Sequence, residues 1–273
     1  MTFLDVLQTL AANPATPLDV AEAALLFASD EYPNLDCYHY LRQIDDLAKE
    51  VVPLLKGNVE SRVASLARFL FEEVGFRGND ADYYDPRNSY LNDVLDRRVG
   101  IPISLSVLAM AVGQRAGLQI EGVGLPGHFV AKAVDGLQEV YFDPFHGGQL
   151  LTPAACRSLV EAVTGQSLPL DDIPLESSPL GAIISRMLNN LKSIYLQRED
   201  FRRAVRVIER LRVVHPDDLF QQRDLGVALV RAGRSGAAID HLSACLAGHS
   251  DGPDAELVKQ VLTEAKKEVL RWN

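Results

Sequence analysis

The chain has 273 residues, 47% of them hydrophobic, and a formal net charge of −10. This acidic balance argues against a nucleic-acid backbone as the partner. The longest uncharged run, residues 99–114, is shorter than the ~20 residues that a membrane-spanning helix needs. The three cysteines are far apart and odd in number, which is typical of a reducing compartment and excludes a disulfide framework. The first residues, MTFLDVLQTL, lack the basic region of a signal peptide. We therefore expect a cytoplasmic globular protein with neither a nucleic-acid nor a membrane partner.

Residues 1–75 predict a shell of helices. Asp19 follows Thr16-Pro17 and opens one helix, residues 35–55 give a second, and Asn58 caps a third that Gly75 ends. Residues 76–95 then have the composition of a loop. Within this loop, four residues are candidates to line a cleft near the Gly100 turn: Tyr83, Tyr84, Arg87 and Asn88.

The next segment predicts a buried helix. Residues 103–112 carry no charge and have no clear polar face, so this helix should be covered on nearly all sides. Pro102 suits its first turn, where the missing N–H costs nothing. The positive end of the helix therefore lies near Gly100 to Ser104.

An Asp135-Gly136 pair between two β-rich runs is a strong signal for a β-hairpin. If these two residues form the turn, His128 faces Asp143 and Lys132 faces Glu139. Phe129 and Phe142 then pair on the other face of the hairpin. In a nucleophilic triad, an imidazole acts as the base and a neighbouring carboxylate orients it. His128 and Asp143 are therefore candidate catalytic residues.

The C-terminal part has a repeating pattern. After a helix predicted over 152–163, the proline-rich residues 165–180 indicate a linker. Beyond it, a period of 34 residues aligns Tyr195 with Leu229 and Ala204 with Ala238, which is the spacing of tetratricopeptide repeats. We expect two repeats, over 185–218 and 219–252, followed by a last helix.

Three motifs together carry a resemblance to a known family. They are NSYLNDVLDRRVGIPISLS (88–106), LPGHF (125–129) and DPFHGG (143–148). They resemble the transglutaminase-like fold, and more closely the bacterial SirB-type family, in which such a domain precedes tetratricopeptide repeats. The resemblance implies an α+β, papain-like domain at 1–172 with N-terminal helices, and an all-α repeat segment at 181–273.

The same resemblance implies a catalytic cysteine at the start of the buried helix, and this chain has none there. Pro102 stands at that position, and Ser104 is the nearest hydroxyl. One hypothesis is therefore a degenerate, non-catalytic protein, a pseudoenzyme, that acts as a regulatory or interaction module and binds a protein partner through its repeats. The alternative is a serine-type hydrolase or acyl-transferase that uses Ser104, His128 and Asp143.

His146, three residues after Asp143, is a further candidate for the lining of the cleft. Together with His128 and Asp143 it offers two imidazoles and one carboxylate, a thin set of metal ligands. The Asp143-Pro144 turn leaves the geometry of these side chains unspecified. We expect no metal and no cofactor.

Overall fold

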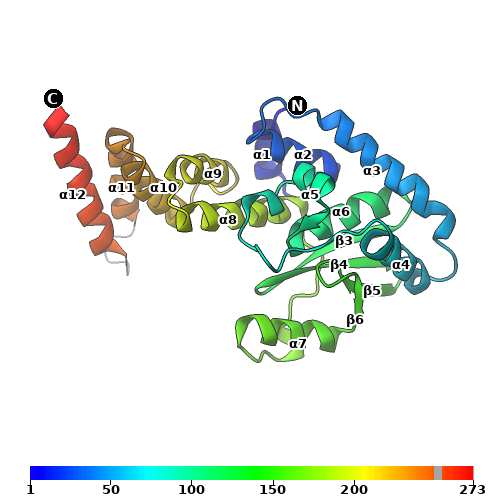
Figure 1. The fold of residues 1–273 in the computed structure, drawn as a ribbon. Helices are drawn as coiled ribbons and strands as arrows, with labels where there is room; N and C mark the ends of the chain where they lie inside the picture. Colours follow the sequence, from blue (N-terminus) through cyan, green and yellow to red (C-terminus); the bar gives the residue numbers. More distant parts are fainter. Residues whose placement is uncertain (249–253, 273) are drawn as a thin grey trace. The chain divides into compact units, whose positions relative to one another are not determined.

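A computed structural model of the chain describes residues 1–248 and 254–272 (Figure 1). The contacts divide the chain into two compact units. The first unit comprises Met1–Val6 and Pro14–Ile184, and the second comprises Leu7–Asn13 together with the chain from Ser185 onward. The sequence did not predict that Leu7–Asn13 would group with the second unit. Among the described helices, none combines the length and the apolar character needed to cross a membrane.

The N-terminal part is helical, as predicted. Asp19 accepts a hydrogen bond from the Glu22 amide and caps one helix, and Asn58 caps another by accepting from the Ser61 amide. The last turns before Gly75 are π-helical. The elements are α1 (Phe3–Ala12), α2 (Val20–Ser29), α3 (Cys37–Val51), η1 (Val52–Leu54), α4 (Val59–Ala67) and η2 (Arg68–Glu73).

A loop segment leads from this shell to the central helix. It forms β1 (Arg77–Gly78), η3 (Pro86–Asn88), α5 (Leu91–Arg97) and β2 (Val99–Gly100), and β1 pairs with β2 in parallel. The central helix α6 (Pro102–Arg115) follows directly. Every residue of α6 from Pro102 to Gly113 is buried, which confirms the prediction from its uncharged sequence.

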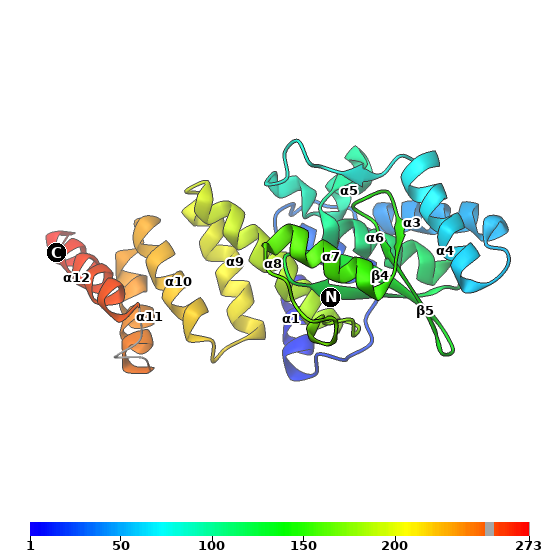
Figure 2. The same ribbon diagram turned by 90° about the horizontal axis from the view of Figure 1, so that it is seen from below.

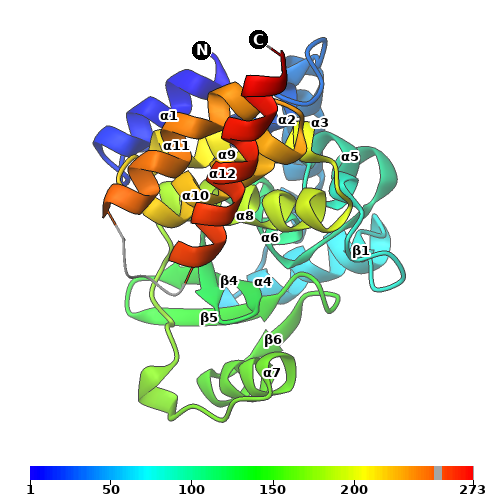
Figure 3. The same ribbon diagram turned by 90° about the vertical axis from the view of Figure 1, so that its left-hand side faces the viewer.

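The first unit contains one antiparallel sheet of four strands in the order β3-β4-β5-β6. The strands are β3 (Gln119–Leu125), β4 (His128–Asp135), β5 (Gln138–Asp143) and β6 (Gln149–Leu151). Helix α6 covers one face, where Gly113 lies against Ile120. Helix α7 (Pro153–Thr164) covers the other face with Cys156 and Val160 (Figures 1 and 3).

The hairpin between β4 and β5 forms, but its predicted register is wrong by two residues. Asp135 pairs with Gln138, so Gly136 and Leu137 form the turn. Gly136 has a φ of 60°, whereas Leu137 is not among the residues with positive φ. This is the pattern of a type II′ turn, which places glycine first. An Asp-Gly turn of type I′ would instead have required a positive φ at Asp135.

The error of two residues leaves every side chain on its predicted face, because side chains alternate with a period of two. His128 and Asp143 share the α7 face with Val130, and Phe129 shares the α6 face with Phe142. The contacts across the hairpin are therefore diagonal instead of directly opposite. Lys132 still reaches Glu139, with 2.8 Å between Nζ and Oε1.

The second unit is a series of antiparallel helix pairs (Figure 2). Ala204 and Ala238, which the 34-residue period aligned, are fully buried at equivalent positions. Gly226 lies directly against Leu242, so α10 and α11 approach closely. The predicted end of the second repeat, 249–252, lies outside the described residues. The helices are α8 (Leu180–Gln197), α9 (Phe201–Val214), α10 (Leu219–Arg231), α11 (Ser235–Gly248) and α12 (Ala255–Trp272), and η4 (Leu170–Asp172) precedes them.

Candidate functional site

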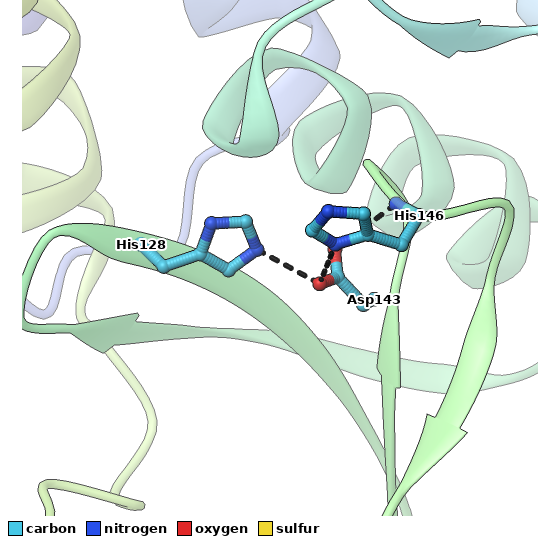
Figure 4. A group of neighbouring side chains, drawn as sticks. All are labelled: His128, Asp143 and His146. Carbon is cyan, nitrogen blue, oxygen red and sulfur yellow. Dashed lines mark hydrogen bonds and ion pairs between the residues drawn. The ribbon is translucent and has the colours of Figure 1, made fainter. Parts of the chain in front are cut away.

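The hairpin brings three ionisable side chains together at one end (Figure 4). His128 is the first residue of β4 and follows Gly127, whose φ of 71° permits the preceding turn. Asp143 is the last residue of β5, and His146 lies in the turn that leads to β6. His128 and Asp143 are buried, whereas 49% of the His146 side chain is exposed.

Both imidazoles bind the same carboxylate oxygen. Nε2 of His128 lies 2.9 Å from Oδ2 of Asp143, and Nδ1 of His146 lies 2.7 Å from that oxygen. The two imidazole rings stack at a centroid distance of 5.6 Å. Because Asp143 engages Nε2 of His128, Nδ1 is the ring nitrogen that a nucleophile would have to approach. The sequence predicted the contact between His128 and Asp143 but not that His146 would share it.

The carboxylate of Asp143 is fixed by the backbone as well. Its Oδ1 accepts hydrogen bonds from the amides of Phe145 at 3.0 Å and His146 at 3.4 Å. Burial alone would raise the pKa of Asp143, but hydrogen bonds from His128 and His146 and their positive charge outweigh it. The pKa of Asp143 therefore lies below its usual value, and the group is a carboxylate at neutral pH.

Aromatic rings surround the two imidazoles. Phe145 contacts His128 and His146 edge to face, with centroid distances of 6.1 and 5.1 Å. Tyr83 packs against Phe145 at 6.0 Å, whereas the exposed ring of Tyr84 packs against Tyr83. Phe145 thus adjoins both histidines, and Tyr83, one of the residues expected to line the cleft, packs against Phe145. The sequence did not predict the place of Phe145. The position of Phe145 between Asp143 and His146 was the available signal.

Ser104 is committed to the backbone at the start of α6. Its hydroxyl donates to the carbonyl oxygen of Asn88 at 2.6 Å and accepts from the amide of Ile101 at 3.0 Å. Only 1% of Ser104 is exposed. In the described part of the chain, this hydroxyl bonds to backbone groups of Asn88 and Ile101 and not to His128. The structure therefore does not join the three residues of the hypothetical triad.

Asn88 is fully buried and holds the preceding loop together. Its side-chain amide donates to the carbonyl oxygens of Asp82 and Tyr83, and its Oδ1 accepts from Asn79. The sequence predicts that Asn88 lines a cleft, but the structure places it inside the loop. Its neighbour Asp85 is also buried and bridges Arg87 and Arg97.

The cysteines do not supply the missing thiol at the start of α6. Cys156 lies on the buried face of α7 against the sheet, where burial, with the charge of Asp143, raises the pKa of its thiol to about 11. Cys37 lies on α3, and burial also raises its thiol pKa. Cys245 lies on α11 in the second unit, and burial raises its pKa too. A thiol with a raised pKa is a poor nucleophile at neutral pH.

Comparison with known proteins agrees with this fold. A profile of the transglutaminase-like superfamily matches residues 38–189, and a tetratricopeptide-repeat profile matches residues 191–263. These matches define the chain as a transglutaminase-like domain followed by tetratricopeptide repeats.

Curated relatives narrow this assignment. A UPF0162 protein of Xylella fastidiosa is 34% identical over 97% of this chain and 96% of its own length. One from Vibrio cholerae is 29% identical over 73% of this chain and 74% of its own length. The chain therefore belongs to the UPF0162, or SirB-type, family of bacterial transglutaminase-like proteins.

The similarity also extends beyond this family. Mouse F-box only protein 21 is 30% identical over 54% of this chain, a match that covers 24% of the mouse protein. No solved structure matches the chain significantly.

Proposed function

We propose that this protein is a non-catalytic member of its superfamily, a degenerate transglutaminase-like domain joined to a protein-interaction module. The observation that carries the proposal is the state of the Ser104 hydroxyl. Its proton goes to the Asn88 carbonyl oxygen, and its oxygen accepts from the Ile101 amide. A serine nucleophile must instead give its proton to an aligned base. Pro102 begins the helix at the position where the family resemblance expects a thiol.

The repeats support the interaction part of the proposal. Tetratricopeptide repeats are elongated stacks of helix pairs, and such stacks provide extended binding surfaces. Residues 182–236 contain more Lys and Arg than Asp and Glu, although the whole chain is acidic. A protein with acidic groups is therefore the kind of partner that this segment favours. We place the protein in the cytoplasm, where its cysteines stay reduced.

Covalent probes test the non-catalytic part. The full chain is incubated with a serine-reactive fluorophosphonate and, separately, with a thiol-reactive acylating probe, and modified residues are mapped by mass spectrometry. We expect no adduct on Ser104. We also expect no cysteine adduct whose formation requires His128. An adduct on Ser104 that disappears in His128→Ala would establish the hydrolase instead.

That alternative has one observation in its favour, the buried contact of 2.9 Å between His128 and Asp143. For the alternative to hold, Ser104 would have to leave the Asn88 carbonyl and approach Nδ1 of His128. Asp143 would then fix the tautomer of the imidazole. The probe experiment decides between the two functions.

A pair of matched variants tests the interaction part. Phe220 on α10 is 60% exposed, and Leu137 at the hairpin tip of the first unit is fully exposed. The wild-type chain is used to capture proteins from a lysate, and the captured proteins are quantified. The capture is then repeated with the Phe220→Ser variant and with the Leu137→Ser variant. We expect a specific partner to be lost with Phe220→Ser and retained with Leu137→Ser. Loss with Leu137→Ser alone would contradict binding through the repeats.

A further inference from the structure

Three potential metal ligands converge at the end of the hairpin (Figure 4). Nε2 of His128, Oδ2 of Asp143 and Nδ1 of His146 all lie within 4.8 Å of one another. Two imidazoles and one carboxylate are the donors of open zinc sites, which keep a fourth position for water. We propose that these three residues bind one divalent transition-metal ion, with Zn²⁺ as the ion that fits best. This inference goes beyond the proposed function and requires no reaction.

The spacing of the ligand atoms suits such an ion. At Zn–N and Zn–O distances of about 2.0–2.1 Å, ligand atoms at tetrahedral corners lie roughly 3.3 Å apart. In the structure, Asp143 Oδ2 lies 2.9 Å from His128 Nε2 and 2.7 Å from His146 Nδ1. Protons hold these pairs together, and the three ligand atoms all lie within 4.8 Å of one another. An ion that replaces the protons needs Oδ2 to move away from both nitrogens and brings the two imidazole nitrogens to the same tetrahedral spacing. Binding would therefore release protons.

The surroundings already fix the ligands in place. Backbone amides of Phe145 and His146 hold Oδ1 of Asp143, which aims Oδ2 at the two rings. Phe145 packs edge to face against both imidazoles. Such contacts in the outer shell orient metal ligands and raise affinity. The sequence left this geometry open at the Asp143-Pro144 turn, and for that reason it predicted no metal.

The exposure of the three residues provides a route to the site. His128 and Asp143 are buried, but 49% of the His146 side chain is exposed. An ion can therefore reach the cluster from the side of His146. The fourth coordination position would face solvent on that same side. Such an ion would link the first residue of β4 to the turn between β5 and β6.

The test uses the full chain without a histidine tag, treated with a chelator and then titrated with Zn²⁺ by calorimetry. Co²⁺ serves as the spectroscopic probe, because its absorption bands report the geometry of the site. We expect one ion per chain, with Co²⁺ bands of a four- or five-coordinate site. The thermal midpoint should rise by about 5 °C when free Zn²⁺ exceeds Kd by about a hundredfold.

His146→Ala is the decisive variant, because this half-exposed side chain can be removed without opening the core. We expect it to weaken Zn²⁺ binding by at least about a hundredfold, since an outer-shell residue alone accounts for ~10–100-fold. His39→Ala is the matched control, because His39 is exposed on α3, where its ring bonds to the side chain of Gln43. His128→Gln should abolish the Co²⁺ bands. Unchanged binding in His146→Ala, or no binding by the wild-type chain, would overturn the proposal.

Discussion

The hydroxyl of Ser104 donates a hydrogen bond of 2.6 Å to the backbone carbonyl of Asn88. Both residues are buried, so this bond ties the loop before α5 to the first turn of α6. Its energetic role can be measured independently of any reaction. The same oxygen accepts from the Ile101 amide, so Ser104 satisfies one acceptor and one donor of the backbone.

Ser104→Ala should lower the free energy of unfolding by about 1–2 kcal/mol, because it leaves a buried carbonyl and a buried amide without partners. Urea denaturation of the full chain, monitored by far-UV circular dichroism, measures this loss in the first unit. Ser106→Ala is the control, because the buried Ser106 hydroxyl has no hydrogen-bond partner in the described part of the chain. That variant should be neutral or stabilising. Equal losses in both variants would contradict the assigned role of Ser104.

The surroundings of Asp85 predict that the stability of the fold decreases at low pH. Burial would raise its pKa, but hydrogen bonds from Arg87 and the charges of Arg97 and Arg87 outweigh burial and lower it. A carboxyl with a lowered pKa in the folded state stabilises the fold above its unfolded pKa of about 3.9. This stabilisation is lost as pH falls through the lowered folded pKa.

Asp85→Asn should therefore cost about 1–3 kcal/mol at pH 7 and much less near pH 3, measured by urea denaturation at each pH. The exposed pair of Asp46 and Lys49 on α3 provides a control. Asp46→Asn should change stability by less than about 0.5 kcal/mol at either pH. A penalty for Asp85→Asn that stays constant with pH would show that the charge of Asp85 is not responsible.

The turn of the hairpin can be tested with adjacent substitutions. Gly136 has a φ of 60°, and a Cβ added there would meet no atom within 4 Å. The cost of Gly136→Ala is therefore purely conformational, about 1 kcal/mol. Leu137→Ser should lie within about 0.5 kcal/mol of the wild type, because Leu137 is fully exposed. Hydrogen exchange of the β4 and β5 amides measures the loss of stability in both variants. A larger loss for Leu137→Ser than for Gly136→Ala would place the turn elsewhere.

Substitution by alanine at two glycines of the repeats should change the stability of the chain in opposite directions. In a helix, Gly→Ala usually stabilises by up to about 1 kcal/mol. At Gly226 of α10, the added Cβ would lie 2.6 Å from Leu242 side-chain atoms, so Gly226→Ala should destabilise. At Gly236 of α11, the nearest such atom belongs to Val269 at 4.0 Å, so Gly236→Ala should stabilise. Thermal denaturation of the full chain distinguishes the two, and the same sign for both would contradict the close approach of α10 and α11.

Local patterns were sufficient to predict the central helix and the faces of the hairpin. The uncharged run from Ile103 to Val112 could only be stable if it was buried, and α6 is buried on all sides. Alternation along β4 and β5 placed His128 with Asp143 and Phe129 with Phe142. The same alternation could not fix the register. A turn at Asp135-Gly136 and a turn at Gly136-Leu137 leave every side chain on the same face.

The environment of the site depends on contacts that no local pattern encodes. Ser104 lies at a helix start in the sequence, but its partner Asn88 reaches it only because the loop folds back onto α6. His146 joins His128 at Asp143 only because the turn after β5 brings its ring back over the strand. Both arrangements depend on the conformations of segments between regular elements, where sequence is least informative.

The two oxygens of Asp143 have separate tasks. Oδ1 holds the amides that shape the turn into β6, and Oδ2 holds the two imidazoles. An aspartate at this position thus contributes to the local structure of the fold, whether or not any substrate is turned over. Its presence, taken alone, is not a record of ongoing catalysis. A lineage that lost its thiol could keep this carboxylate indefinitely, and with it two histidines available for a different use.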